Sequence, residues 1–298
     1  MFDIKESYKK DIIASIDIGT HNMCAVIAEI AENQTLQILG AGISSSQGLR
    51  QGVVVNLDAA VESIKNAVHE AQLTAGVKIN DVVVGIAGDH IKGFNSRGMV
   101  AVSKSGSAII QDDVDKVLKA AKAIALPKDR IVLHRIPQEY IVDNQNGIDN
   151  PVGIKGVRLE AEIHIVTCSE ISLQNITSSV KKAGLRPAGY VLESLAASYA
   201  VLDKSEKELG VAMIDLGGGT TDLIIFCNGS IRHTAVISLG GENVTKDIAL
   251  ELKTPPEEAE ELKRKFGSCY KNRISSTENF TVPGIGGRPP REEKREEL

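Results

Sequence analysis

The order of hydrophobic and polar positions predicts a chain in which strands and helices are interspersed. The apolar runs IIASIDI at residues 12–18 and CAVIAEI at residues 24–30 are joined by a short polar turn at residues 19–22, which indicates a β-hairpin. From Leu57 to Ala75 apolar residues recur every three or four positions, and Gly76 follows. This spacing predicts an amphipathic helix that ends at a glycine cap.

The middle of the chain continues this mixture. Residues 82–86 are predicted to form a buried strand and residues 158–168 an alternating strand. A helix is expected over residues 112–126, because Pro127 would stop it there. We also expect Ile131-Val132-Leu133 to be an apolar strand with an exposed edge, since the neighbouring helices could bury only one of its faces. Together these patterns predict an α/β protein.

The second half repeats the opening arrangement. Strands over Val211–Asp215 and Leu223–Cys227 flank a glycine-rich turn, and a hairpin turn is predicted at Asn228-Gly229. Helices are predicted over residues 171–183, 191–202, 242–252 and 256–266. After Gly267 the pattern fails, and we expect residues 268–298 to be either a flexible tail or the start of an unfinished element.

Composition narrows the class of protein. Hydrophobic residues make up 42% of the 298 residues and charged residues 24%, which is typical of a globular chain of about two domains. The 34 basic and 39 acidic residues give a net charge of −5, aromatic residues are only 3%, and Trp is absent. A nucleic-acid partner is therefore not expected, because neither a basic groove nor an aromatic stacking platform is indicated.

Cysteine spacing and apolar run lengths indicate a cytoplasmic protein. The four cysteines are far apart and form no CxxC pair, so a metal cluster or a disulfide scaffold is not expected. Residues 1–16 mix charged residues with short apolar pairs and do not resemble a signal peptide. No apolar run approaches the roughly 18 to 20 residues that cross a bilayer.

Two segments of the chain carry the same candidate chemistry. Residues 16–20 (IDIGT) and residues 214–222 (IDLGGGTTD) each leave an apolar strand and enter the next one. Glycine lets backbone N–H groups approach phosphate oxygens, threonine hydroxyls add donors, and an aspartate can hold the water shell of a metal ion. One Asp-x-Gly copy alone is more often ordinary hairpin chemistry. Two copies favour a pair of loops that grip a triphosphate.

With these loops, the sequence resembles the actin, Hsp70 and sugar-kinase ATPase superfamily. Within it the chain is most similar to FtsA, the bacterial cell-division actin homologue, over almost its whole length. The segments that carry the likeness are Gly48–Gln72, Val82–Val102, Gln111–Thr167 and Ile237–Leu250. The resemblance implies an actin-like (ribonuclease H-like) two-domain ATPase fold with an FtsA-type 1C insert subdomain.

The resemblance also implies a division into subdomains. These are residues 1–84 (1A, first part, with phosphate loop 1), 85–162 (the SHS2-like 1C insert), 163–202 (1A, second part, and connecting helix), 203–252 (2A, with phosphate loop 2) and 253–298 (the start of 2B). Relatives continue for roughly another domain's worth of chain. The expectation is that 2B is truncated here and that the family's C-terminal membrane helix is absent.

Residue roles follow from the same resemblance. Asp17 and Asp215 are expected to organise Mg²⁺, and Glu193 and Asp215 to act in catalysis, although a solvated helix-face residue is the plain alternative for Glu193. The residues expected to contact ATP are Asp17, Gly19, Thr20, Gly217, Gly218, Gly219, Thr220, Thr221, Gly240, Gly241, Glu260 and Lys263. For Glu260 and Lys263, an ion pair on the surface of one helix is about as good an explanation. For Gly240 and Gly241, the alternative is that they only form the N-terminus of a helix.

One departure from the family lies in the first loop, which usually continues into a lysine that reaches the phosphates. Here His21-Asn22 follow Thr20 instead. The affinity for phosphate is therefore expected to be weaker, unless His21 replaces the lysine as a donor. The more ordinary interpretation is that His21 is only a residue of the turn.

The leading functional prediction is an ATP- and Mg²⁺-binding, actin-like cell-division protein. The resemblance implies that it self-associates into filaments through 1C and links FtsZ to the inner face of the cytoplasmic membrane at the septum. Glu193 is the only candidate strong base, so we expect at most a slow ATPase. A small-molecule kinase of the same superfold and a pilus-assembly scaffold remain as alternatives.

Overall fold

The computed structural model describes residues 12–33, 35–103, 106–284 and 289–298. Its central unit is a five-stranded sheet in the order β11-β6-β1-β2-β3. The strands are β1 (Ile12–Ile18), β2 (Asn22–Ile30), β3 (Leu36–Ser45), β6 (Asp81–Ile86) and β11 (Arg186–Leu192). β1, β2 and β3 are antiparallel neighbours, whereas β6 runs parallel to both β1 and β11. The predicted hairpin over residues 12–30 is confirmed.

Helix α1 (Leu57–Ala75) covers β3 and has the predicted bounds. Asn56 accepts a hydrogen bond from the first turn, and Gly76 ends the helix with φ 68°, a left-handed conformation that favours glycine. The helix lies very close to β3, because a Cβ on Gly42 would stand 2.2 Å from the Ala67 carbonyl oxygen. A short hairpin, β4 (Leu49–Arg50) and β5 (Val53–Val54), precedes α1.

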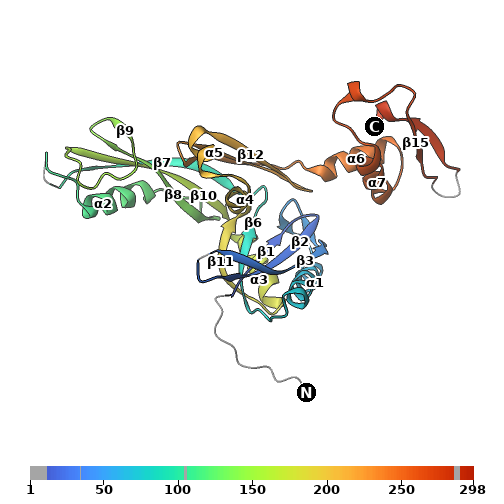
Figure 1. The fold of residues 1–298 in the computed structure, drawn as a ribbon, viewed down its shortest axis with the longest axis horizontal. Coiled ribbons are helices and arrows are strands. Elements are labelled where there is room, and N and C mark those ends of the chain that lie inside the picture. Colours follow the sequence, from blue (N-terminus) through green and yellow to red (C-terminus); the bar gives the residue numbers. More distant parts are fainter. Residues whose placement is uncertain (1–11, 34, 104–105, 285–288) are drawn as a thin grey trace, which may run out of the picture.

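The insert between β6 and α3 is a second sheet, in the order β7-β10-β8-β9, with one helix on it. Its elements are β7 (Lys92–Ala101), α2 (Gln111–Lys122), β8 (Arg130–Val142), β9 (Gln145–Ile148) and β10 (Arg158–Ser169). It forms the left end of the molecule in Figure 1 and has a hydrophobic cluster of its own.

The structure corrects three predictions in this region. Helix α2 ends at Lys122, because the backbone leaves helical geometry at Ala123, well before Pro127. β10 is buried on both faces instead of alternating, since it is a central strand that also contacts α2, α3 and β14. The edge at residues 131–133 is not exposed: these side chains are half-buried, and Ile131 and Leu133 pack against the main core.

Two helices connect the central sheet to the second half. α3 (Glu170–Lys182) begins at Ser169, whose hydroxyl accepts a hydrogen bond from Ser172 N, and α4 spans Glu193–Val201. The helix predicted over residues 191–202 therefore begins two residues late. Val191 and Leu192 belong to β11, and no turn residue in the sequence marks the boundary between this strand and α4, which follows it directly. A short helix, α5 (Lys204–Leu209), follows.

The second half contains a three-stranded antiparallel sheet, β12-β13-β14. β12 (Val211–Leu216) and β13 (Thr221–Cys227) flank the glycine-rich turn as predicted. The predicted turn at Asn228-Gly229 is confirmed, with φ 52° and 73°, and leads into β14 (Ser230–Ile237). In Figure 1 this sheet runs from the insert toward the opposite end of the molecule.

The far end is a separate small unit. Helices α6 (Gly241–Glu251) and α7 (Pro256–Phe266) pack with a two-stranded sheet, β15 (Asn279–Val282) and β16 (Arg291–Lys294), and with the 3₁₀ turns η1 (Lys271–Arg273) and η2 (Arg295–Glu297). Both described parts of the predicted tail are thus ordered, because Phe280 and Val282 complete an apolar cluster with the helices. Residues 285–288 of that tail lie outside the described residues.

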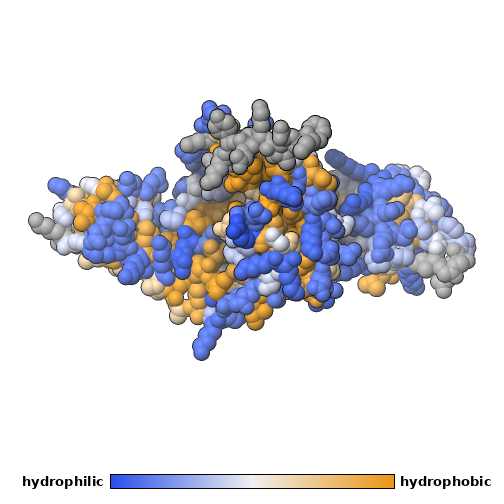
Figure 2. Space-filling model, turned by 90° about the horizontal axis from the view of Figure 1, so that it is seen from below, coloured by the Kyte–Doolittle hydropathy of each residue, from blue (hydrophilic) through white to orange (hydrophobic). Residues whose placement is uncertain are grey.

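The main hydrophobic core joins the central sheet to the β12–β14 sheet, since Ile224, Phe226 and Ile231 belong to the same cluster as Ile16 and Ile64. In the view from below, apolar residues lie mostly over the middle of the molecule and the right-hand end is largely hydrophilic (Figure 2). None of the helices in the described part is long and apolar enough to cross a membrane. The prediction for the N-terminal residues falls largely on residues 1–11, outside the described part.

Candidate functional site

A cleft of about 420 Å³ lies where the β1–β2 turn faces the β12–β13 turn. These turns are the two repeated segments singled out in the sequence. They almost touch, because a Cβ on Gly219 would stand 2.9 Å from Thr20 Oγ1 and a Cβ on Gly218 would stand 2.9 Å from His21 Cβ. The fold therefore brings together two loops that are about 200 residues apart in the chain.

The loop backbones are packed too closely for larger residues. A Cβ on Gly240 would stand 2.4 Å from the Gly218 carbonyl oxygen, so this position tolerates only glycine without a shift of the backbone. Gly241 N donates to Gly217 O (3.0 Å), which places the N-terminus of α6 beside the second loop. A helix N-terminus next to a glycine-rich loop is a favourable place for an anion.

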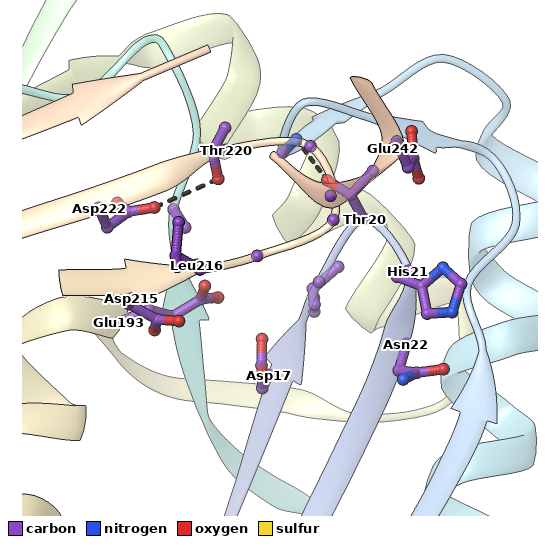
Figure 3. A pocket seen from close by; sticks show the side chains of 18 of the residues that line it. Asp17, Thr20, His21, Asn22, Glu193, Asp215, Leu216, Thr220, Asp222 and Glu242 are labelled. Carbon is purple, nitrogen blue, oxygen red and sulfur yellow. Dashed lines mark hydrogen bonds between the residues drawn. The ribbon is translucent and has the colours of Figure 1, made fainter. Parts of the chain in front are cut away.

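Carboxylates gather on the opposite side of the cleft (Figure 3). Asp17 lies near the end of β1, Asp215 in β12, Asp222 in β13, and Glu193 is the first residue of α4. All of them line the same cavity. The charges that raise the pKa of Asp17, Glu193 and Asp222 are those of the other carboxylates in the group. The group therefore concentrates negative charge that a bound cation would offset.

Glu193 is the most perturbed of these acids. Removal from water, the negative charge of Asp17 and a hydrogen bond with Asp17 together raise the pKa of Glu193 well above its usual value. The same burial, opposed by that hydrogen bond and reinforced by Asp215, raises the pKa of Asp17. Glu193 Oε1 is buried without a hydrogen-bond partner, and the backbone of Gly85 leaves it room, since a Cβ there would stand 2.8 Å from this oxygen.

Asp222 is a cleft residue that the sequence analysis did not assign. Its side chain is only 6% exposed, and Thr220 Oγ1 donates to Oδ2 (3.2 Å) while Oδ1 has no partner. Burial raises the pKa of Asp222 to about 6, with a further rise from Asp215 that the bond from Thr220 opposes. The final residue of the second repeated segment was the signal that could have identified it.

A cationic group closes the far side of the cleft. Lys263 Nζ donates to Gly241 O (3.0 Å) and Thr245 Oγ1 (2.8 Å) and pairs with Glu260 (2.6 Å). Burial alone would raise the pKa of Glu260, but hydrogen bonds from Lys263, Thr245 and Arg264 lower it to about 2. Glu260 and Lys263 are therefore more than a surface pair, because they tie α7 to α6 at the cleft wall.

The structure gathers most of the residues predicted for the site. Those that line the cleft are Asp17, Gly19, Thr20, Glu193, Asp215, Gly217, Gly218, Gly219, Thr220, Gly241, Glu260 and Lys263. Thr221 and Gly240 do not line it: Thr221 Oγ1 donates to Leu239 O (2.7 Å), and Gly240 packs beneath the second loop.

Further residues that line the cleft are Ile18, His21, Asn22, Gly52, Ala87, Leu216, Asp222, Glu242 and Arg264. His21 Nε2 lies 3.3 Å from an Arg264 guanidinium nitrogen, so its ring reaches across the cleft to α7. Gly52 N donates to Thr20 Oγ1 (3.1 Å) and supports the first loop from the side.

The donor set fits a hard divalent cation only in part. Carboxylate oxygens are the ligands that Mg²⁺ prefers, and Glu193 Oε1 and Asp222 Oδ1 lack partners. Within the described ranges, however, no group of three or more His, Cys, Asp or Glu side chains converges closely enough to hold a metal. The residues present therefore fit an ion that takes most of its ligands from water and a bound phosphate.

Two segments of the chain match models of known families. Residues 88–167 match the family model described as the SHS2 domain inserted in FTSA, and residues 212–298 match that of cell division protein FtsA. Cell division protein FtsA of Pseudomonas aeruginosa is 45% identical over 287 residues, which covers 96% of this chain and 68% of that protein. FtsA of Escherichia coli K12 is 38% identical over 295 residues, with 99% and 70% covered.

Solved structures share the fold at low sequence identity. A chain of the PilM-PilN type IV pilus biogenesis complex superposes with a TM-score of 0.64 at 17% identity, over 86% of this chain and 70% of that one. MreB5 of Spiroplasma citri bound to AMPPNP superposes with a TM-score of 0.52 at 16% identity, over 98% and 73%. The fold is therefore actin-like, with the insert characteristic of one family, as the sequence predicted.

Proposed function

The chain belongs to the FtsA family of cell division proteins, and from this we propose that its cleft binds ATP together with Mg²⁺. The observation that carries the proposal is the pair of aspartate- and glycine-containing loops that face one another across a cleft lined with carboxylates. MreB5, which shares the fold, has been solved with ADP and with AMPPNP. A nucleotide in the corresponding cleft of this chain is the simplest use of the two loops.

In this proposal each side of the cleft has its own role. The glycine-rich loops, with Gly19 and Thr20 on one side and residues 217–220 on the other, offer backbone and hydroxyl donors to the phosphates. Asp17 and Asp215 hold the water shell of Mg²⁺, which would neutralise phosphate charge. Gly241, Glu260 and Lys263 form the wall beside the nucleoside, and Gly240 supports the second loop from beneath.

Hydrolysis, if it occurs, is proposed to be slow. Glu193 lines the cleft beside its hydrogen-bond partner Asp17, where it could orient a water molecule toward the terminal phosphate, and Asp215 would share that task. Burial and the negative charge of Asp17 raise the pKa of Glu193 well above its usual value, and this favours the protonated form, which cannot act as a base. The nucleotide would then serve mainly to fix the relative position of the two halves.

At the level of the cell, we propose the role that family membership favours. The protein would self-associate into filaments through the insert and link FtsZ to the cytoplasmic membrane at the division site. The insert carries no phosphate-loop segment, so assembly is a more plausible task for it than catalysis. Its edge strands, β7 and β9, are better candidates for subunit contacts than residues 131–133, which pack inward.

Calorimetric titration with Mg-ATP tests the central proposal. Asp215→Ala should weaken binding about 10- to 100-fold, because it removes a carboxylate that orients the metal's water ligands. Asp247→Ala, which removes an exposed carboxylate on α6 away from the cleft, should bind like the unaltered protein. Equal affinities for the two variants would exclude Asp215 from the site, and no heat of binding with the unaltered protein would refute the proposal.

A further inference from the structure

One short strand contacts the insert and leads into the segment beneath the second loop of the candidate nucleotide cleft. β14 has eight residues, Ser230–Ile237, and is held on one side by β13 along its whole length. On the other side it contacts β7, β8 and β10 of the insert. Its end leads directly into Ser238, Leu239 and the glycines beneath the second loop.

The cleft end of this strand is tied to both loops. Gln51 and Gly52 lie in the turn of the β4–β5 hairpin. Gln51 Nε2 donates to Ser238 O (2.9 Å), and Gly52 N donates to Thr20 Oγ1 of the first loop. Thr221 Oγ1 of the second loop donates to Leu239 O (2.7 Å). A change in the separation of the two loops therefore acts on the two residues that follow β14.

The insert end is fixed by a buried histidine. His164 of β10 is fully buried, and its ring nitrogens contact Asn95 Oδ1 of β7 (2.6 Å) and Thr234 Oγ1 of β14 (2.9 Å). The amide oxygen of Asn95 can only accept, so Nδ1 donates to it and Nε2 accepts from the Thr234 hydroxyl. β7 approaches so closely that a Cβ on Gly93 would stand 2.0 Å from Thr234 Oγ1.

Further polar contacts surround this histidine. Gln138 Nε2 of β8 donates to Ile231 O, Ser230 Oγ donates to Gln138 O (2.8 Å), and Asn95 Nδ2 donates to Arg232 O (3.2 Å). Arg232 pairs with Glu139 at 2.7 Å. These hydrogen bonds fix one register of β14 against the insert, because each bond is directional and a buried partner left unpaired costs free energy. A purely apolar contact would allow the two to slide.

We propose that β14 couples the insert to the cleft: the Asn95–His164–Thr234 contact holds the insert on β14, and the spacing of the two loops sets the position of the same strand at its other end. The insert has its own hydrophobic cluster and can respond as a unit. The coupling is a property of the chain itself. The further claim, that a bound nucleotide controls this coupling, rests on the proposed function.

Hydrogen exchange of the ligand-free protein tests the coupling. Thr234→Val keeps the shape of the side chain and removes the hydroxyl that His164 accepts from. Exchange should become about five- to tenfold faster in residues 93–97 and also in residues 238–242 at the cleft. Thr234→Ser, which keeps the hydroxyl, should restore slow exchange, and Thr74→Val on α1, whose hydroxyl bonds to its own helix, should change neither segment.

Gln138→Leu removes a second contact between the insert and β14 and should accelerate hydrogen exchange in the same two segments. This variant keeps the test possible if Thr234→Val fails to fold. Faster exchange confined to the insert and residues 230–237, with residues 238–242 unchanged in both variants, would overturn the proposal. In a second arm, Mg-ATP should slow exchange in residues 93–97 of the unaltered protein but not of Thr234→Val. If ATP protects no segment of either protein while the ligand-free result holds, the nucleotide proposal fails and the coupling stands.

Discussion

At the residue scale, the least ordinary groups are titratable side chains that the fold has taken out of water. Asp222 and His164 are the clearest cases, and they act in opposite directions. Asp222 has its pKa raised to about 6 and His164 has its pKa lowered to about 4, in both cases chiefly by burial. Each favours its neutral form, so each makes stability depend on pH in a definable window.

For His164, the folded pKa of about 4 lies below the ordinary value of 6.5, so the unfolded chain binds more protons between these pH values. The contribution to stability is complete above pH 6.5 and is lost as the pH falls toward 4. We expect urea unfolding to show a loss of about 3 kcal/mol between pH 7 and pH 4 that His164→Gln lacks. Equal pH slopes for the two proteins would contradict this.

Asp222 behaves in the reverse sense. Its folded pKa of about 6 lies above the ordinary value of 3.8, so its burial is tolerated when it is protonated and becomes destabilising as the pH rises through 6. Asp222→Asn should therefore stabilise the protein at pH 8 by up to about 3 kcal/mol, without added metal or nucleotide, and much less at pH 4. Denaturation at both pH values measures this, and destabilisation at pH 8 would contradict it.

At the scale of single elements, close packing of α1 on β3 depends on glycines. A Cβ on Gly42 would stand 2.2 Å from Ala67 O and 2.4 Å from Ala71 N, both backbone atoms that cannot move independently of the helix. Gly42→Ala should cost about 1–3 kcal/mol or more by forcing α1 away from the sheet. Gly189→Ala in β11, which meets no atom within 4 Å, is the matched control and should be nearly neutral. Similar melting temperatures for both variants would contradict this.

Elements with complete local signals were predictable, and those defined by their neighbours were not. α1 has an apolar stripe, a capping Asn56 and a terminal Gly76, and its bounds were predicted to the residue. β11 could not be separated from α4, since only pairing with β6 makes residues 186–192 a strand. β15 and β16 are polar on their exposed face and were missed, because the apolar cluster that orders them is formed with α6 and α7 and not by a pattern within the strands.

Some residues of the candidate site could likewise be predicted from the sequence, and others could not. The two loops repeat one motif, so their residues were found from the sequence. His21 was considered because it follows the first motif, and Asp222 ends the second motif but was given no role. Arg264 enters the cleft only because the folded chain places α7 there. Thr221 shows the opposite error, since it belongs to the motif but its hydroxyl serves the backbone at Leu239.

At the scale of the whole molecule, the chain has more than one core. The distal unit of α6, α7, β15 and β16 has its own apolar cluster, separate from the main core that joins the two sheets. In Figure 1 it forms the end opposite the insert. It nevertheless contributes Glu260, Lys263 and Arg264 to the cleft, so its stability and nucleotide affinity should be linked.

Phe280→Ala tests this link. Phe280 is 3% exposed and stacks on Phe266 with ring centroids 5.3 Å apart, so its removal should cost about 3–5 kcal/mol within a small cluster. Amides of α7 should then exchange at nearly unprotected rates while those of α1 remain protected, and Mg-ATP should bind more weakly because Lys263 and Glu260 lose their fixed position. Tyr270→Ala, which removes an aromatic ring that is 55% exposed in the same unit, should change neither measurement. Equal loss of protection in α1 and α7 would show instead that the molecule unfolds as one cooperative unit.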